Sequence, residues 1–462
     1  MENNEITKTN KIKIIVITLL VFIVSIAGIT YAYFTIQITG NDTASSMRLS
    51  TANMSLVYND VQIASGSNVY PGWSDTKTLT VTNNGNVTSD YIIKFRELTN
   101  TIINGELVMS ATCSSSSGTC DNLPERAVHS SSTEITNAYM YGPISIDPGV
   151  THTYTLTVEF KETGSNQNYN QNKYFSGTLN IGDGTPTDES CFTTTGTTTL
   201  TITKYDETCG TDVIIPSVIN GKTVTTIYNA TYSSGTYNGS FANKGLTSVV
   251  IPNSVTSIGN NAFNTNQLTS IVIPSSVTTI NVGTFRNNQL TSVTIPSNVT
   301  TIGNSAFREN QLSSVVIPNS VTTIDIYAFM DNRLTSVTIP SGVTTIGHSA
   351  FKNNQLTSVV IPSGVTTING SAFENNRLTS IMIPSTLTAI YSSAFRINRL
   401  TSVVIPNSVT TIDDIAFESN QLTSVTIEGK SSSSDFTTYG SNIWGWASGY
   451  SDSNIVWTGS GS

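Results

Sequence analysis

The second half of the chain repeats one pattern of apolar and polar positions every 22 residues. A unit opens with a stretch such as Leu-Thr-Ser-Val-Thr-Ile-Pro and continues with Val-x-x-Ile and Ala-Phe in a constant register. Eight complete units begin at Leu246, Leu268, Leu290, Leu312, Leu334, Leu356, Leu378 and Leu400, and a shorter ninth runs from Leu422 to Gly429. A period in the twenties with this core predicts a solenoid whose units stack and share one core.

Unit positions are numbered here from 1 at Leu246. Positions 1, 4 and 6 are expected to point inward from a short strand, and positions 2, 3 and 5 outward, because side chains alternate along a strand. The proline at position 7 ends that strand. Positions 10 and 13 return to the core on the opposite wall, phenylalanine at position 18 predicts a stacked aromatic column, and asparagine at position 21 is expected to satisfy backbone groups of the turn. We expect nine near-identical strands in a continuous sheet of roughly 40 Å, with about 4.8 Å between strands.

Both ends of such an array need caps, because a terminal unit has one neighbour only. Residues 190–245 contain one irregular repeat with about fourteen inserted residues, and Cys191 and Cys209 precede it. We interpret this stretch as a disulfide-closed amino-terminal cap. Glu428 replaces the proline of the last unit, and the aromatic-rich tail after it is expected to cover the final repeat.

Residues 41–185 predict a separate all-β domain. Short β-branched runs such as Lys77–Thr82 and His152–Phe160 are separated by turn signals such as Asp147-Pro148-Gly149. Several short strands with this punctuation are typical of a β-sandwich. The predicted fold class is therefore all-β dominated, with an amino-terminal membrane helix or signal, a β-sandwich, and a leucine-rich-repeat β-solenoid with end caps. The expected parts are residues 1–40, 41–185, 186–245, 246–429 and 430–462.

The amino terminus predicts export. Lysines at positions 8, 11 and 13 precede an apolar run, which orients the amino end toward the cytoplasm and the rest of the chain outward. Ile14–Ile36 has 23 residues, enough to span a bilayer. Thr30 and Ala32 have the spacing of a signal-peptidase site, so a cleaved signal peptide stays an equal alternative. Either way we expect an extracellular protein at the cell surface, membrane-anchored at its amino terminus or secreted.

The cysteines fit an oxidising compartment. The four cysteines form two local pairs, Cys113/Cys120 and Cys191/Cys209, and sequence proximity favours these two disulfides among three possible pairings. A metal site is the alternative. Neither pair has a Cys-x-x-Cys spacing or a neighbouring histidine, so we predict structural disulfides.

Composition excludes several functions. The chain has 21 Lys and Arg against 30 Asp and Glu, a formal charge of −9, which argues against nucleic-acid binding. It has three histidines, and no phosphate loop, calcium loop or zinc-protease motif occurs. Asp413-Asp414 is the one adjacent acid pair in the array and has no partner pair, and His348 stands alone at a variable position, where it is expected to face solvent. We therefore predict no enzyme, no metal and no cofactor.

Two family resemblances support this picture. Leu290–Pro296, Val299–Gly303 and Ala306-Phe307 resemble, nearly residue for residue, the BspA-type leucine-rich repeats of bacterial surface proteins. That resemblance implies adhesion and the binding of host or bacterial partners, without a catalytic motif. The units end in Asn-Gln or Asn-Arg, where the family usually has Cys-Asn, and this departure leaves the ligand open. Tyr31–Thr35 and the order of residues 71–85 are similar to TasA/camelysin-type and Ig-like exported β-domains.

Two sets of array residues are candidates for binding. The first is a basic edge at positions 19 and 22: Arg286, Arg308, Arg333, Lys352, Arg377, Arg396 and Arg399. The second is the outward strand face, with Thr269, Thr291, Thr335, Thr357, Thr379 and Thr401. Solubility of a surface edge and hydroxyl pairing between strands are the simpler explanations.

The sequence therefore predicts a non-catalytic surface adhesin that displays the array for protein or glycan recognition, with an anionic polymer as one possible partner. A matrix component that assembles through the β-domain is the alternative function.

Overall fold

The computed structural model describes residues 46–459, except 51–54, 60, 64–70, 86–87, 103–105, 129–130, 162–174, 185 and 234. The predicted membrane segment Ile14–Ile36 lies outside these residues. Within the described part of the chain, no helix has the length and apolar character needed to span a membrane.

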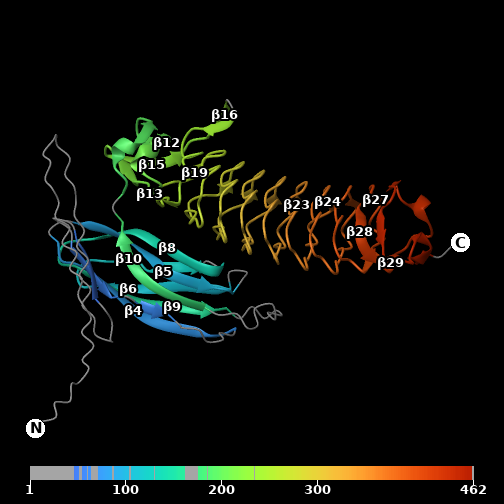
Figure 1. Cartoon of the computed structure of the whole chain (residues 1–462), viewed down its shortest axis with the longest axis horizontal. Helices are drawn as coiled ribbons and strands as arrows, with labels where there is room; N and C mark the ends of the chain where they lie inside the picture. The colour runs from blue at the N-terminus through green and yellow to red at the C-terminus, as the bar shows by residue number, and fades with distance from the viewer. Residues whose placement is uncertain are drawn as a thin grey trace, which may run out of the picture.

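Two antiparallel sheets form the amino-terminal part, which we call the β-domain (Figure 1). One sheet contains, in spatial order, β1 (Ser46–Ser50), β2 (Ser55–Asn59), β4 (Ser74–Asn83), β9 (Thr151–Phe160), β6 (Leu107–Ser115) and β7 (Leu123–Ala127). The other contains β3 (Val61–Ile63), β10 (Phe175–Asp183), β5 (Ser89–Asn100) and β8 (Ser131–Ile146). The two sheets share one apolar core, as two sheets that pack face to face do.

Strand β9 shows how the sequence builds this core. Every second residue from His152 to Phe160 is buried, and threonine or another polar residue stands at most of the outward positions. Tyr154 and Leu156 of this strand meet Phe95 of β5 and Leu179 of β10 in the shared core. The alternating pattern predicted for residues 152–160 is therefore confirmed.

Residues 187–459 form a β-solenoid with caps, about ten turns long (Figure 1). The amino-terminal cap and irregular repeat contain β11 (Phe192–Thr195), β12 (Thr199–Tyr205), β13 (Asp212–Ile214), β14 (Val218–Ile219), β15 (Lys222–Ile227), β16 (Thr231–Ser233) and β17 (Thr236–Asn238). Short 3-10 helices lie in the two caps: η2 (Glu189–Cys191), η3 (Glu207–Cys209), η4 (Ser433–Asp435) and η5 (Asp452–Asn454). No α-helix occurs among the described residues.

A ladder of two-residue strands at positions 12 and 13 runs along one wall of the array. These strands are β19 (Ser257–Ile258), β20 (Thr279–Ile280), β21 (Thr301–Ile302), β22 (Thr323–Ile324), β23 (Thr345–Ile346), β24 (Thr367–Ile368), β25 (Ala389–Ile390) and β27 (Thr411–Ile412). Neighbours pair in parallel from β20 to β23 and from β24 to β27, with the isoleucines in register. Each isoleucine is buried, as predicted for position 13.

The predicted continuous sheet at positions 2–6 is not formed as expected. Full strands occur only near the ends, as β18 (Ser248–Val250), β26 (Ser402–Ile405) and β29 (Ser424–Ile427). In the described middle of the array, isolated β-bridges at position 5, such as that between Val272 and Thr294, join adjacent units. Backbone hydrogen bonds between residues at position 2 of adjacent units also join them. Where a strand does reach position 6, the proline at position 7 follows it directly, as Pro406 follows β26.

The aromatic column and the asparagine column are both confirmed. The phenylalanines of units 1 to 8 are fully buried, and successive rings stack with centroids 5.2–5.7 Å apart. Asn332 represents the asparagines: its Oδ1 accepts from the Leu312 N–H at 3.0 Å, and its Nδ2 donates to the carbonyls of Phe307 and Phe329 at 2.9 and 3.1 Å. Each asparagine thus ties its own turn to the preceding one.

Both caps extend the aromatic column. Tyr205 stacks on Phe241, whose ring lies 5.1 Å from Phe263 at the start of the array. At the other end Trp444 stacks on Phe417 at 5.3 Å. The carboxyl-terminal strands are β28 (Phe417–Leu422), β30 (Thr438–Tyr439), β31 (Trp444–Trp446) and β32 (Ile455–Trp457). The tail therefore covers the last repeat, as its sequence predicts.

Candidate functional site

Four of the seven predicted basic residues lie in ion pairs along position 19. The pairs are Arg286–Glu309, Arg308–Glu309, Arg308–Asp331, Lys352–Glu374, Arg396–Glu374 and Arg396–Glu418, with N to O distances of 2.6–3.5 Å. The acids come from positions 19 and 20 of the same or adjacent units. In this part of the predicted basic edge, carboxylates of the same or the adjacent turn therefore offset the charge of these four cations.

Glu374 is the centre of this row. Its side chain is 8% exposed and lies between Lys352 and Arg396. Burial alone would raise the pKa of Glu374, but hydrogen bonds from Lys352 and Ser371 and the neighbouring Arg396 hold that pKa below its usual range. The ion pairs of position 19 therefore connect adjacent turns and do not form a free charged surface.

Three arginines at position 22 form what we call the arginine column: Arg333, Arg377 and Arg399. All three are exposed, and none forms an ion pair within the part of the chain that the structure describes. Arg377 and Arg399 belong to adjacent turns, and Gln355 separates them from Arg333. The column is therefore the positively charged part of the predicted basic edge that can reach a partner.

The strand face changes character along the array. In units 3 and 4 the position-3 serines are almost fully covered, with Ser314 3% exposed, whereas Ser358 and Ser380 in units 6 and 7 are exposed. At position 5, Val360 is 70% exposed and Met382 is 76% exposed. The equivalent Val272 and Val316 in units 2 and 4 are half-buried.

The β-domain accounts for this difference. Figure 1 shows the β-domain beside the early units of the array, and a cleft of about 1130 Å³ lies between the two parts. Its array wall includes Val272, Thr294 and Val316, and its other wall includes Arg126 and Tyr141 of the β-domain. The strand face is thus partly covered in units 2 to 4 and open in units 6 to 8.

We call the uncovered part the open face and define it by Val360, Met382 and Val404 at position 5 and by Thr357, Thr379 and Thr401 at position 2. All six side chains are exposed. Among the other predicted strand-face residues, Thr269 is exposed, and Thr291 and Thr335 are half-buried. Hydroxyl contacts between turns do occur, because the Thr357 hydroxyl donates to the Thr335 carbonyl at 3.5 Å.

The apolar row of the open face was not recognised from the sequence as a candidate site. A signal existed, since position 5 alternates between threonine and an apolar residue and becomes Val-Met-Val in units 6 to 8. An outward position in the unit does not by itself predict that a side chain is exposed. The β-domain covers part of the strand face, and this contact joins parts of the chain that are distant in sequence.

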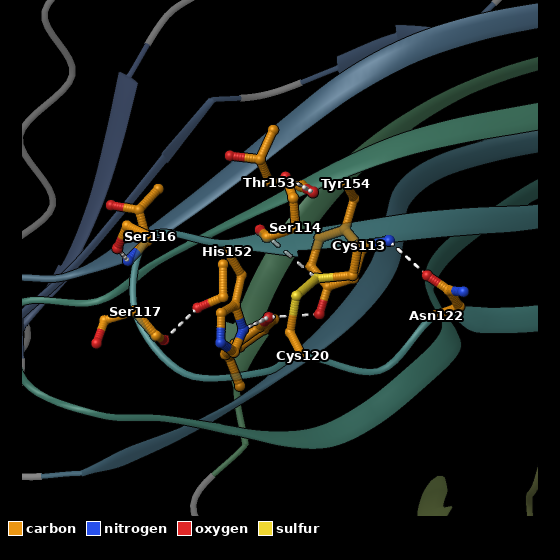
Figure 2. The surroundings of a disulfide bond; sticks show 12 residues. Cys113, Ser114, Ser116, Ser117, Cys120, Asn122, His152, Thr153 and Tyr154 are labelled. Carbon is orange, nitrogen blue, oxygen red and sulfur yellow. Dashed lines mark hydrogen bonds between the residues drawn. A yellow bond between two sulfur atoms is a disulfide. The ribbon is translucent and has the colours of Figure 1, made fainter.

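Both predicted disulfides are present, Cys113–Cys120 and Cys191–Cys209. Figure 2 shows the first, at one end of β6 and close to His152 and Tyr154 of β9. The Cys113 N–H donates to Asn122 Oδ1 at 2.8 Å, which helps to hold the loop that the disulfide closes.

His152 belongs to a buried hydrogen-bonded group. Its Nδ1 lies 2.9 Å from the Tyr91 hydroxyl, which lies 2.8 Å from the Tyr154 hydroxyl. Burial lowers the pKa of His152 and raises the pKa of Tyr91 and of Tyr154. His348, by contrast, is exposed in unit 5, as predicted. The described residues contain no cluster of three or more His, Cys, Asp or Glu side chains that could hold a metal ion.

The regular unit matches a known repeat family. Residues 234–355 and 322–442 match the family described as BspA type leucine rich repeat region. The repeat region is of the BspA type. The BspA-type region coincides with the stacked turns and their phenylalanine column, so the resemblance inferred from units such as Leu290–Gly303 is confirmed.

Solved structures of other proteins, several of them described as leucine-rich, are also similar to this chain. A leucine-rich repeat protein from Bacteroides ovatus is 21% identical over 58% of this chain and 70% of its own, with a TM-score of 0.40. A leucine rich cell surface protein from Faecalibacterium prausnitzii is 22% identical over 58% and 96%, with a TM-score of 0.29. The pneumococcal vaccine antigen PcpA is 18% identical over 56% and 85%, with a TM-score of 0.34. A comparison with curated proteins finds no match.

Proposed function

We propose that this protein is a non-catalytic binding protein of a bacterial cell surface. The amino-terminal segment exports or anchors it, and the array recognises an anionic, repetitive partner such as a wall polymer or an acidic glycan. The observation that carries the proposal is an uncovered strand face in units 6 to 8 together with Arg377 of unit 6 and Arg399 of unit 7, which have no ion-pair partner among the described residues.

The charge distribution favours an anionic partner. The position-19 cations are neutralised within the array, whereas Arg377 and Arg399 project from adjacent turns into solvent. Neighbouring turns of such an array are about 4.8 Å apart, so the column presents positive charge at a regular spacing. A polymer with regularly spaced negative groups can contact several arginines at once.

The open face supplies the second part of the surface. Val360 and Met382 are apolar and more than two-thirds exposed, and the threonines at position 2 provide hydroxyl groups beside them. Exposed apolar residues gathered in one row are typical of interaction surfaces rather than of ordinary solvent-facing sheets. A partner that contacts the arginine column and also buries this row would gain both charge and apolar contact.

The binding test replaces the column arginines by the residue that most units have at the same position. Glutamine occupies position 22 in five of the eight complete units, so R333Q/R377Q/R399Q converts the column to the common residue of that position without disturbing the turn. The matched control, R286Q/R308Q/K352Q, removes the same charge from position 19. Binding of the purified full chain to immobilised teichoic acid and to heparin is measured at low and high salt.

The first triple variant is expected to lose most of its binding, and the control to retain it. Single exposed charge contacts contribute below about 1 kcal/mol each, so the triple change should exceed any single one. Binding by the parent should also weaken as salt rises. A column variant that binds as tightly as the parent at low salt would contradict the proposal.

Export is tested separately, on intact cells that produce the full chain. Added protease should degrade the array, because residues after about 40 are expected outside. Complete protection of the array in intact cells, together with its degradation after lysis, would contradict a surface location.

A further inference from the structure

One insertion interrupts the regular repeat, and it forms a projecting hairpin. Strands β16 and β17 pair in antiparallel register, with Tyr232 opposite Tyr237. Figure 1 shows β16 at the outer edge of this end of the array. We call residues 228–233 and 235–243 the tyrosine hairpin; they include this pair and the segments that join it to the first turns. Unlike the turns of the array, it adds nothing to the aromatic column except Phe241 at its end.

The base of the tyrosine hairpin is firmly attached. The Ala230 N–H donates to the Asn260 carbonyl at 2.8 Å, and the Asn260 N–H donates to Asn229 Oδ1 at 2.7 Å. Gly239 lies so close to the opposite segment that a Cβ there would be 2.9 Å from the Asn229 carbonyl oxygen. The hairpin therefore projects from a fixed base.

Its aromatic side chains face solvent. Tyr232 is 66% exposed and Tyr228 is 51% exposed, which makes them the most exposed tyrosines in the part of the chain that the structure describes. The Tyr232 and Tyr237 rings meet edge to face at 5.1 Å. This contact fixes the orientation of the pair while one ring stays largely uncovered, so the hairpin presents a preformed aromatic surface.

The hairpin itself is polar but carries no charged side chain. Residues 228–243 contain no Asp, Glu, Lys or Arg, and consist largely of Tyr, Asn, Thr, Ser and Gly. Tyrosine with serine, glycine and asparagine is the composition of recognition loops, in which rigid rings provide contact area and small polar side chains provide hydrogen bonds. The Asn243 amide, which donates to the Thr236 hydroxyl at 3.1 Å, shows that such groups are already oriented within the hairpin.

We propose that the tyrosine hairpin is a binding site for neutral glycans. A sugar ring has an apolar face that fits against an aromatic ring, and hydroxyl groups that pair with amides and hydroxyls. The absence of charge in residues 228–243 favours a neutral ligand at this site and distinguishes it from the arginine column. The two sites are independent, because the hairpin precedes unit 1 and the column begins at the end of unit 4.

The test measures retardation of the full chain in native gels that contain yeast mannan, β-1,3-glucan or dextran. The parent should be retarded by at least one of these neutral polysaccharides, equally at about 0.05 M and about 0.5 M salt, since no charge is involved. Tyr232→Ala should weaken that binding by about tenfold, equivalent to about 1.4 kcal/mol. Tyr391→Ala, which removes an exposed tyrosine from unit 7, is the matched control and should bind like the parent.

Further variants distinguish the loss of the aromatic ring from the unfolding of the hairpin. Tyr232→Val keeps a residue that favours strands but has no aromatic face, so it should bind as weakly as the alanine variant. Tyr232→Phe keeps the ring and should bind nearly as well as the parent. The proposal is overturned if none of the three polysaccharides retards the parent, or if Tyr232→Val is retarded as strongly as the parent.

Discussion

The β-domain and the array bury their apolar residues in different ways. In the β-domain, strands distant in sequence pair across two sheets, and each core residue, such as Phe95 or Leu179, has its own set of neighbours. In the array, each residue packs mainly on copies of itself 22 residues away. The array therefore depends on contacts between nearest neighbours, whereas the β-domain depends on contacts that form together.

The largest expected effect tests the aromatic column. Phe329 is fully buried and stacks on Phe307 and Phe351 at 5.5 Å. Phe329→Ala should destabilise the array by about 3–5 kcal/mol and divide its unfolding into two steps, because the units on either side lose their contact. Denaturant unfolding followed by hydrogen exchange measures both effects.

Met382→Ala is the control for that change, because its side chain is 76% exposed. It should alter stability by less than about 0.5 kcal/mol. If Phe329→Ala unfolded in one cooperative step with the denaturant midpoint of the parent, the aromatic column would not connect the turns.

The disulfides compare the two regions directly. Cys191–Cys209 closes the longer loop, with a separation of 18 residues against 7 for Cys113–Cys120. Replacing each pair by alanine should cost about 3 and about 2.5 kcal/mol, respectively. Hydrogen exchange should locate the first loss at the amino-terminal end of the array and the second within the β-domain. Equal loosening of both regions by either change would contradict this separation.

The array was predictable from the sequence because every position recurs in the same environment. The buried phenylalanines, the role of Asn332 and the caps around Tyr205 and Trp444 all follow from one unit and its two ends. The ion pairs of position 19 were predictable in principle, since Lys352, Glu374 and Arg396 hold the same position in successive turns. A prediction that considers only the positive residues of the edge misses the ion pairs that they form with these acids.

The cover over the strand face could not be predicted in this way. It depends on how the surface of the β-domain, which has no period, meets units 2 to 4 of the array. Nothing in the unit distinguishes Ser314, which is buried, from Ser358, which is exposed. The location of the open face is therefore a property of the whole chain rather than of its repeat.

A change of pH should affect the β-domain more than the array. Burial lowers the pKa of His152 below that of the unfolded chain, about 6.5. As the pH falls below that value, the unfolded state binds a proton that the folded state does not, so the β-domain loses stability. The midpoint of its denaturant transition, compared at pH 7.5 and 5.5, measures this loss.

His152→Gln should remove most of that pH dependence, although it also alters the contact with Tyr91. His348→Gln changes an exposed histidine of the array and should leave the pH dependence as it is. If the β-domain of the parent were equally stable at the two pH values, buried neutral His152 would not be its pH-sensitive group.

The smallest expected effect separates the paired row from the arginine column. Lys352→Gln leaves the buried Glu374 with one cation instead of two, and should cost at most about 1 kcal/mol of stability. Arg377→Gln breaks no ion pair among the described residues and installs the common residue of position 22, so its stability should change by less than about 0.5 kcal/mol. Thermal unfolding of both variants at low salt compares them. If Arg377→Gln cost more stability than Lys352→Gln, Arg377 would have to form an ion pair in solution. The arginine column would then have no free cations that could bind a partner.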